Sequence, residues 1–176
     1  MNNVHPALDI NSYLSDGFKK LCDVENGDNR VGTVYHGKFY YTNIDQTLMF
    51  SKHRSWVYMI VNNSVIEKVG ETGNPLGIRK SNGCTQPKWS TECRIGRLAS
   101  WKCNTDGRIK EELYESCNKN NVSIYVKKCD QSIKTISIAG QIKTMYLSCH
   151  KDLEMTILDH IFQQTNTYPR LNQCRK

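Results

Sequence analysis

The stretch Ser55–Arg79, SWVYMIVNNSVIEKVGETGNPLGIR, carries the strongest local signals in this chain. Residues 56–61 are aromatic and branched, which favours a β-strand. Residues 62–64 are turn formers that tolerate left-handed backbone. Residues 65–69 are a second run of strand character, which ends at Gly70. The stretch therefore predicts a β-hairpin.

A helix of about two turns is expected after this hairpin. Asn74 is a favourable N-cap, and Pro75 suits the first helical position. Gly83 is a typical residue to end the helix. Arg79 would then lie on the helix, close to the hairpin.

The register of the hairpin decides which side chains share a face. With a three-residue loop over Asn62–Ser64, Tyr58 lies directly opposite Lys68. Directly opposite residues share a face, with Cβ atoms roughly 4.5–5.5 Å apart. A two-residue loop would shift the register by one and separate the two side chains. The three-residue loop therefore predicts that a phenol and an ammonium project together.

These residues, in this order, resemble the core of the GIY-YIG nuclease superfamily. Val57–Met59 stands at the first motif, Lys68–Gly70 at the second, and Arg79 follows. Trp56 and Val57 replace the first two letters of GIY. Lys68 replaces the second tyrosine, as in the short type II restriction endonucleases of the superfamily.

The resemblance continues downstream and covers roughly residues 54–173. Glu154 opens a helix that is followed by Tyr168–Asn172, like the family's glutamate helix with its proline and asparagine. Thr91–Arg97, TECRIGR, is similar to the same restriction-enzyme branch. We expect an α/β fold: a small, mainly antiparallel central sheet flanked by helices.

The resemblance implies Mg²⁺-dependent hydrolysis of phosphodiester bonds in double-stranded DNA by a type II restriction endonuclease. It implies the catalytic residues Tyr58, Lys68, Arg79 and Glu154, with Tyr58 as general base and Glu154 as the metal ligand. Mg²⁺ prefers oxygen ligands and needs few carboxylates, and Mn²⁺ is expected to substitute for it. An ordinary tyrosine, with a pKa of about 10, is a poor base at neutral pH. A nearby ammonium favours the phenolate, which gives Lys68 a role.

Glu154 has two interpretations from the residues alone. It lies at the edge of an apolar stripe of the expected helix Lys151–Gln164, seven residues before Ile161. A buried carboxylate is costly unless it is paired or binds metal. The alternative is a solvated carboxylate that stabilises the positive N-terminus of the helix.

The connection from Gly83 to Trp101 combines basic and aromatic residues. Such side chains hold phosphates and stack on bases, although Trp89 and Trp101 are equally compatible with a small apolar cluster. The residues predicted to bind DNA are Lys80, Lys88, Trp89, Arg94, Arg97 and Asn172. Arg79 is expected to pair with phosphate oxygens, and Asn172 also to order the site by hydrogen bonding.

Composition is compatible with this interpretation. The formal net charge of +7 favours a polyanionic partner, although many basic proteins are merely soluble. No apolar run of about 18 residues is present, so a membrane span is not expected. The N-terminus lacks a basic-then-apolar leader, so we expect a cytoplasmic protein of a bacterial or phage-infected cell.

The eight cysteines are scattered, and no two have the spacing of a zinc knuckle. Reduced structural thiols are expected, and the alternative is a zinc site built from Cys84, Cys93 and Cys103.

The first 53 residues lie upstream of the resemblance. They are expected to form an extension packed on a core of residues 54–176, within one compact domain. The extension would contain a helix over Asn11–Cys22 and a hairpin with strands 31–35 and 38–42, with one helical turn near residues 44–50.

Further elements are expected between residues 106 and 147. They are a helix over 106–120, a strand over 122–128, and a hairpin with strands 135–138 and 141–147.

Two rival functions stay open at this point. One is a phage or mobile-element DNA endonuclease with relaxed specificity, and the other is a non-catalytic DNA-binding module. A nuclease that cuts both strands would need a homodimer or sequential nicking.

DNA affinity is expected to fall as salt rises, because Lys and Arg release counterions from the phosphates. Each neutralised phosphate should contribute a slope of about −0.9 in log affinity against log salt, measured with a labelled duplex. An affinity that stays constant from low to moderate salt would contradict this. Replacing Arg94 or Arg97 by alanine distinguishes two kinds of DNA contact. A loss of discrimination at one base position of the target indicates base readout, whereas an equal loss of affinity for all sequences indicates phosphate contact.

Overall fold

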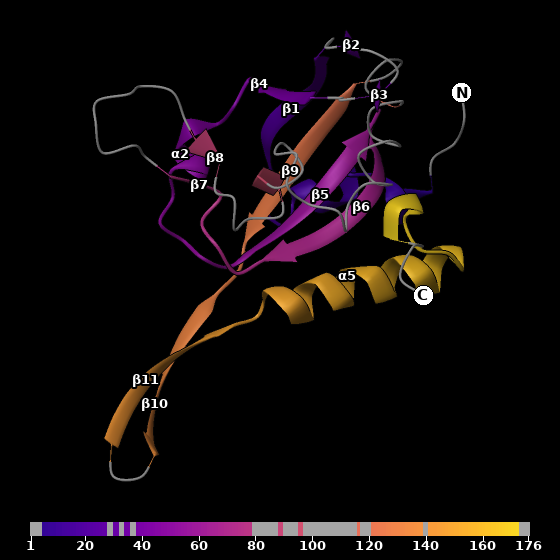
Figure 1. Cartoon of the computed structure of the whole chain (residues 1–176). Coiled ribbons are helices and arrows are strands. Elements are labelled where there is room, and N and C mark those ends of the chain that lie inside the picture. The colour runs from indigo at the N-terminus through magenta and orange to yellow at the C-terminus, as the bar shows by residue number, and fades with distance from the viewer. Residues whose placement is uncertain are drawn as a thin grey trace.

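The centre of the fold is a sheet of five antiparallel strands in the order β4-β1-β9-β5-β6 (Figure 1). The strands are β1 (Lys19–Gly27), β4 (Lys38–Thr42), β5 (Trp56–Asn62), β6 (Val65–Thr72) and β9 (Val122–Lys128). The structure is a computed structural model that describes residues 5–27, 30–31, 34–35, 38–78, 88–89, 95–96, 116, 121–138 and 141–172. The expected α/β fold with an antiparallel central sheet is confirmed.

Short helices and one long helix flank this sheet. They are η1 (Pro6–Leu8), α1 (Asn11–Leu14), α2 (Gln46–Met49), α5 (His150–Thr165) and η3 (Arg170–Asn172). Two small strand pairs are β2 (Arg30–Val31) with β3 (Val34–Tyr35), and β7 (Gly77–Ile78) with β8 (Lys88–Trp89). Among the described helices, none is long and apolar enough to cross a membrane.

Alternation along β5 divides the core between the two faces of the sheet. Trp56, Tyr58 and Ile60 point to one side, where they pack with Met49 of α2 and with Leu171 of η3. We call this side the Tyr58 face.

The other side of the sheet is the α5 face. Val57 and Met59 point to it and pack against Ile157, Leu158 and Ile161 of α5. The predicted helix is therefore confirmed, beginning one residue earlier and ending one residue later than expected.

The hairpin β5–β6 is confirmed, but its predicted loop is wrong. The turn has two residues, Asn63 and Ser64, both with positive φ (46° and 73°), which matches the right-handed twist of the strands. A bulge beside Ile60 then adds one residue to β6. Tyr58 consequently pairs with Gly70 and not with Lys68.

A two-residue turn alone would have put Tyr58 and Lys68 on opposite faces of the hairpin, and the bulge returns them to the same face. Lys68 pairs with Ile60, and Ile60 shares a face with Tyr58 because side chains alternate along a strand. Tyr58 and Lys68 are thus diagonal neighbours on the Tyr58 face, at a spacing of roughly 7–8 Å for such positions.

The N-terminal segment enters the sheet instead of forming the predicted long helix. α1 ends at Leu14, and Gly17 then adopts φ +92°, a conformation that favours glycine. β1 follows and pairs with both β9 and β4, so the predicted helix over 11–22 and the predicted pairing of 31–35 with 38–42 are wrong. The division of the chain at residue 53 remains a prediction.

The predicted helix after the hairpin is also wrong where the chain is described. Gly77 and Ile78 form β7, which pairs with β8. Gly77 packs so closely on α2 that a Cβ there would lie 2.7 Å from Cγ of Met49. The remainder of that predicted helix, including Arg79, lies outside the described residues.

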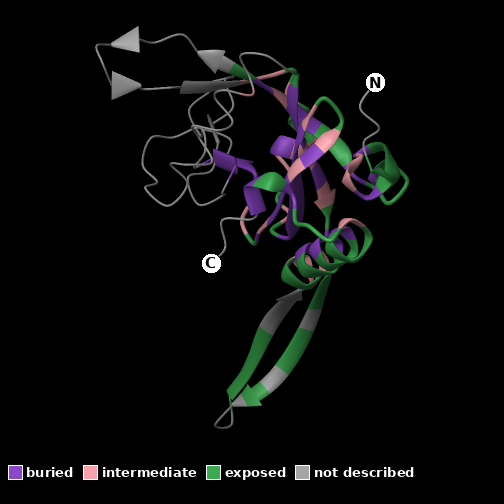
Figure 2. Cartoon of the chain, turned by 90° about the vertical axis from the view of Figure 1, so that its right-hand side faces the viewer, coloured by how far each residue is buried: buried purple, intermediate pink, exposed green. Residues whose placement is uncertain are grey.

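The hairpin β10–β11 (Gln131–Ile138 and Gln141–Ser148) projects from the body as an arm (Figures 1 and 2). Its described side chains are exposed (Figure 2). The predicted hairpin is confirmed with longer strands, and β9 covers the predicted strand 122–128. The predicted helix 106–120 lies outside the described residues apart from Ser116, which is helical.

We expect Gly70→Ala to destabilise the protein, because a Cβ there would overlap the ring of Tyr58. Overpacking of this kind typically costs about 1–3 kcal/mol, which urea unfolding can measure. Gly73→Ala is the matched control, since its Cβ would meet Cε1 of His150 at an ordinary 3.4 Å. Equal stability of the two variants would contradict the described position of Tyr58.

Candidate active site

Tyr58 and Lys68 occupy the Tyr58 face of the hairpin, and both are buried. The ring of Tyr58 lies over the backbone of Gly70, which is why the strand has no side chain there. Lys68 is only 7% exposed, and its Nζ donates to the carbonyl oxygen of Leu171 at 3.4 Å. Lys68 is therefore a buried ammonium two residues along β6 from the glycine that lies under the phenol ring.

Asn172 fixes the outer edge of β6. Its side-chain oxygen accepts from the backbone N–H of Val69, and its side-chain nitrogen donates to the carbonyl of Val69, both at 2.8 Å. β6 is the last strand of the sheet, so these two groups would otherwise lack a strand partner. Asn172 is buried, and its observed role is to hold the segment between Lys68 and Gly70.

Glu154 is 4% exposed and stands at the start of the buried stripe of α5. The alternative of a solvated carboxylate is therefore wrong. Its oxygens are hard donors of the kind that Mg²⁺ prefers, so the residue is suited to hold that ion. Within the described part of the chain, no three His, Cys, Asp or Glu side chains gather into a metal cluster.

The basic connection is anchored on the Tyr58 face. Leu76 and Ile95 are buried there, and the hydroxyl of Tyr41 donates to the carbonyl of Ile95 at 2.9 Å. β8 sets Lys88 opposite Ile78, the residue before Arg79. Ile95, a described residue of this connection, thus packs on the side of the sheet that carries Tyr58.

The other predicted DNA contacts lie outside the described side chains. Lys88 and Trp89 are described by their backbone alone, and Arg79, Lys80, Arg94 and Arg97 lie outside the described residues. The structure brings Tyr58, Lys68 and Asn172 together along the hairpin. Glu154 lies on the helix that covers the other face.

Two further residues at this end of the sheet, Glu71 and His150, form a pair that no sequence motif indicated. Glu71 lies in β6, where its Oε2 is 3.1 Å from Nε2 of His150, and both side chains are mostly buried. The useful signal was the strand period, which places Glu71 on the same face as Val57.

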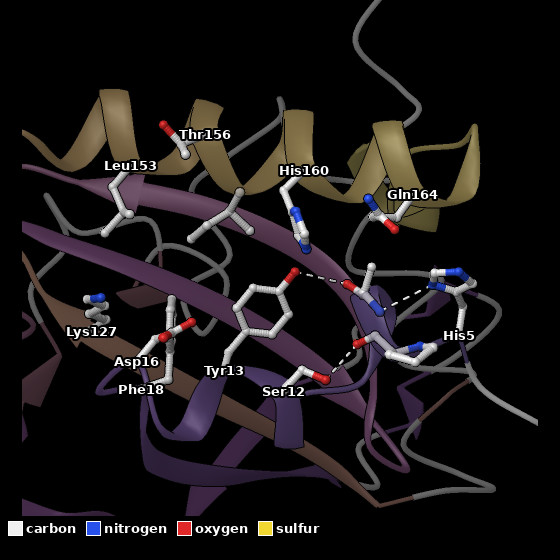
Figure 3. A pocket seen from close by; sticks show the side chains of 13 residues that line it. His5, Ser12, Tyr13, Asp16, Phe18, Lys127, Leu153, Thr156, His160 and Gln164 are labelled. Carbon is white, nitrogen blue, oxygen red and sulfur yellow. Dashed lines mark hydrogen bonds between the residues drawn. The ribbon is translucent and has the colours of Figure 1, made fainter.

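A hollow of about 630 Å³ lies between η1, α1 and α5 (Figure 3). Its wall includes Tyr13, Lys127 and His160, and none of the predicted site residues. The hydroxyl of Tyr13 donates to the carbonyl of Ala7 at 3.0 Å. Burial, with a smaller effect of Asp16, raises the pKa of Tyr13 to about 12, so this phenol is protonated near neutral pH.

The described cysteines behave as structural thiols. Cys22, Cys129 and Cys149 are free. Burial, aided by Cys149, raises the pKa of Cys129 to about 11, which keeps it protonated and unreactive. The alternative zinc residues Cys84, Cys93 and Cys103 lie outside the described residues.

Comparisons with known proteins identify the fold. The sequence matches no protein-family model and gives no significant match to a curated protein. The structure is similar to that of a mutant of EndoII from bacteriophage T4, with a TM-score of 0.53 and 16% identity over 88% of this chain and 95% of that chain. Restriction endonuclease HPY188I in complex with product DNA matches with a TM-score of 0.44 and 18% identity, over 100% of this chain and 98% of that chain.

We expect Asn172→Asp to destabilise the protein, because a carboxylate cannot donate to the carbonyl of Val69. A buried group left without its partner costs about 1–3 kcal/mol, which urea unfolding can measure. Asn121→Asp makes the same change at an exposed position and should alter stability by less than about 0.5 kcal/mol. Similar losses in the two variants would show that Asn172 does not secure the edge of β6.

Proposed function

We propose that this protein is a Mg²⁺-dependent endonuclease of double-stranded DNA with a GIY-YIG-type site. The observation that carries the proposal is the burial of Tyr58 and Lys68 on one face of a hairpin, with Gly70 beneath the phenol ring. The fold supports it, because the endonuclease EndoII of bacteriophage T4 has a similar one. The formal net charge of +7 suits a polyanionic substrate.

In this proposal Tyr58 accepts the proton of the attacking water. Lys68 favours the phenolate form that this step needs, since an opposite charge nearby stabilises an ionised group. Arg79 is assigned to the phosphate oxygens, which its planar fork can bind in pairs. Asn172 holds β6 at Val69, next to Gly70, through two hydrogen bonds.

Glu154 is assigned to hold the metal. When bound, Mg²⁺ would polarise the phosphate and stabilise the leaving oxygen, and Mn²⁺ could replace it. A site with a single protein carboxylate is compatible with Mg²⁺, which retains several waters. The proposed DNA contacts are Lys80, Lys88, Trp89, Arg94 and Arg97, with Asn172 acting on the hairpin.

We favour a sequence-specific restriction endonuclease that acts as a homodimer in a bacterial or phage-infected cell. A phage enzyme with relaxed specificity is the second candidate, and the similarity to EndoII of bacteriophage T4 favours it. Plasmid incubated with the protein and Mg²⁺ distinguishes these possibilities. Discrete bands support the first, a smear supports the second, and retarded but uncut plasmid indicates a DNA-binding module.

The decisive prediction concerns Tyr58→Phe and Glu154→Gln. Both variants should bind DNA nearly as well as the parent, because affinity is distributed over many basic contacts. Loss of the base should reduce single-turnover cleavage by about 10²–10⁴-fold, and added Mg²⁺ should not restore it. For Glu154→Gln, high Mg²⁺ or Mn²⁺ should restore part of the rate, because the amide keeps one oxygen donor.

Binding is measured separately in Ca²⁺, so that affinity and chemistry are not confused. If Tyr58→Phe cuts at nearly the parent rate, Tyr58 is a packing residue and the mechanism is wrong. If Glu154→Gln loses helix content and DNA binding together, Glu154 is structural and the metal is held elsewhere.

A further inference from the structure

The two ends of the β10–β11 arm meet at Ser55, the residue before β5. On the entering side, the backbone N–H of Cys129 donates to the carbonyl of Ser55 at 2.9 Å. On the leaving side, Oγ of Ser55 lies 3.2 Å from Nδ1 of His150. Ser55 is fully buried, so it holds both ends of the arm from within the protein.

His150 is held at both of its ring nitrogens. Its Nε2 lies 3.1 Å from Oε2 of Glu71, in a mostly buried pair. A carboxylate can only accept, so Nε2 carries a hydrogen and donates to Glu71, while Nδ1 and the Ser55 hydroxyl share a second hydrogen bond. The edge of the ring faces Gly73, where a Cβ would make an ordinary contact with Cε1 at 3.4 Å. The position and orientation of the imidazole are therefore fixed.

A hydrogen-bonded sequence of Ser55, His150 and Glu71 has the same order as a hydrolase triad. Here it is a structural unit, because Ser55 is bound on both sides, to Cys129 through its carbonyl and to His150 through its hydroxyl. Its effect must lie in what the three residues hold in place.

The element that they hold is the N-terminus of α5. The helix begins at His150, and the side chain of its N-cap, Cys149, makes no capping hydrogen bond. The Cys149 thiol instead donates to the carbonyl of Asp130 at 3.4 Å. The imidazole of His150 thus joins a helix end that lacks a side-chain cap to Ser55 and to Glu71 of β6.

Glu154 follows His150 by four residues, which is about one helical turn. Residues four apart lie above one another on the same face of a helix. A shift or rotation of His150 is therefore passed to the carboxylate of Glu154, which is buried in the same stripe.

The β10–β11 arm is closely connected to His150, so movement of the arm would displace this residue if nothing held it. β11 ends at Ser148, and only Cys149 separates it from the first residue of α5. The described side chains of the arm are exposed, so contact with another molecule would act on that junction (Figure 2). Along the chain, His150 with its contacts to Ser55 and Glu71 lies between the arm and Glu154.

We propose that His150, held by Ser55 and Glu71, is a positioning residue that fixes the carboxylate of Glu154 for metal binding. The inference rests on the proposed function, in which Glu154 holds Mg²⁺. His150 does not touch the substrate and acts only through the helix.

The test compares His150→Ala with His150→Gln, whose amide can still donate to Glu71. His160→Ala is the matched control, because it removes an exposed histidine from the same helix. The Mg²⁺ concentration that half-saturates single-turnover cleavage should rise about 10-fold for His150→Ala, the lower end of the effect of losing a direct hydrogen-bond partner of a metal ligand, because His150 acts through the helix. His150→Gln should recover part of this change, and His160→Ala should resemble the parent.

Amide hydrogen exchange supplies a readout that is independent of cleavage. Exchange should accelerate over residues 150–157 of His150→Ala while residues 158–165 keep the parent rate. If His150→Ala does not fold, Ser55→Ala replaces it, since that change removes only the hydroxyl at Nδ1. It should show a smaller shift in the same direction.

The outcomes separate the two proposals. A parent protein that leaves DNA uncut in Mg²⁺ overturns the proposed function and this inference together. A parent that cuts, with a Mg²⁺ requirement and exchange pattern unchanged in His150→Ala or Ser55→Ala, overturns the inference alone. Faster exchange along the whole helix would also overturn it, because His150 would then be a general stabilising residue.

Discussion

The contact between the ring of Tyr58 and the backbone of Gly70 is the constraint on which the rest of the hairpin depends. No other residue type fits at position 70 without moving the ring. The contact requires Tyr58 and Gly70 to be directly paired, and the two-residue turn can satisfy this only if β6 contains an extra residue. The bulge supplies that residue and thereby sets Lys68 on the same face as Tyr58.

An edge strand that carries so much of the candidate site must be held on its open side. β6 is bonded to β5 along one edge, and Asn172 takes the place of a neighbouring strand at Val69 on the other. The ion pair of Arg170 with Glu67, at 2.8 Å, adds a second fixed point beside the bulge. The C-terminal segment thus protects the edge from irregular pairing while it orders the residues around Gly70.

The elements that could be predicted are those whose signal is local. Strand β9 and the arm follow from alternation and turn residues, and α5 follows from an apolar stripe of helical period. The prediction of a helix over residues 11–22 was wrong although their apolar residues have helical spacing. Gly17 interrupts the helix, and the residues from Lys19 onward join the sheet. The segment after Pro75 misled for a similar reason, since the packing of Gly77 on Met49 decides its conformation.

The candidate site divides in the same way. Tyr58, Lys68 and Glu154 could be named from the sequence because their order along the chain resembles a family. The bulge could not be predicted, because no sequence signal marks the extra residue in β6. Without that residue, a two-residue turn would put Tyr58 and Lys68 on opposite faces. The partnership of Glu71 with His150 was hidden because 79 positions separate the two residues and neither lies in a motif.

The sheet itself creates the central difficulty of the proposed chemistry. Tyr58 and Lys68 lie on one face, whereas α5, which carries Glu154, packs on the other. Groups on opposite faces can serve one phosphate only at an open edge, and the edge next to both is that of β6. The relative position of base and metal ligand therefore depends on how firmly β6 and α5 are joined. Asn172 fixes the strand and His150 fixes the helix to it, so the geometry of the proposed site is determined by residues that perform no chemistry.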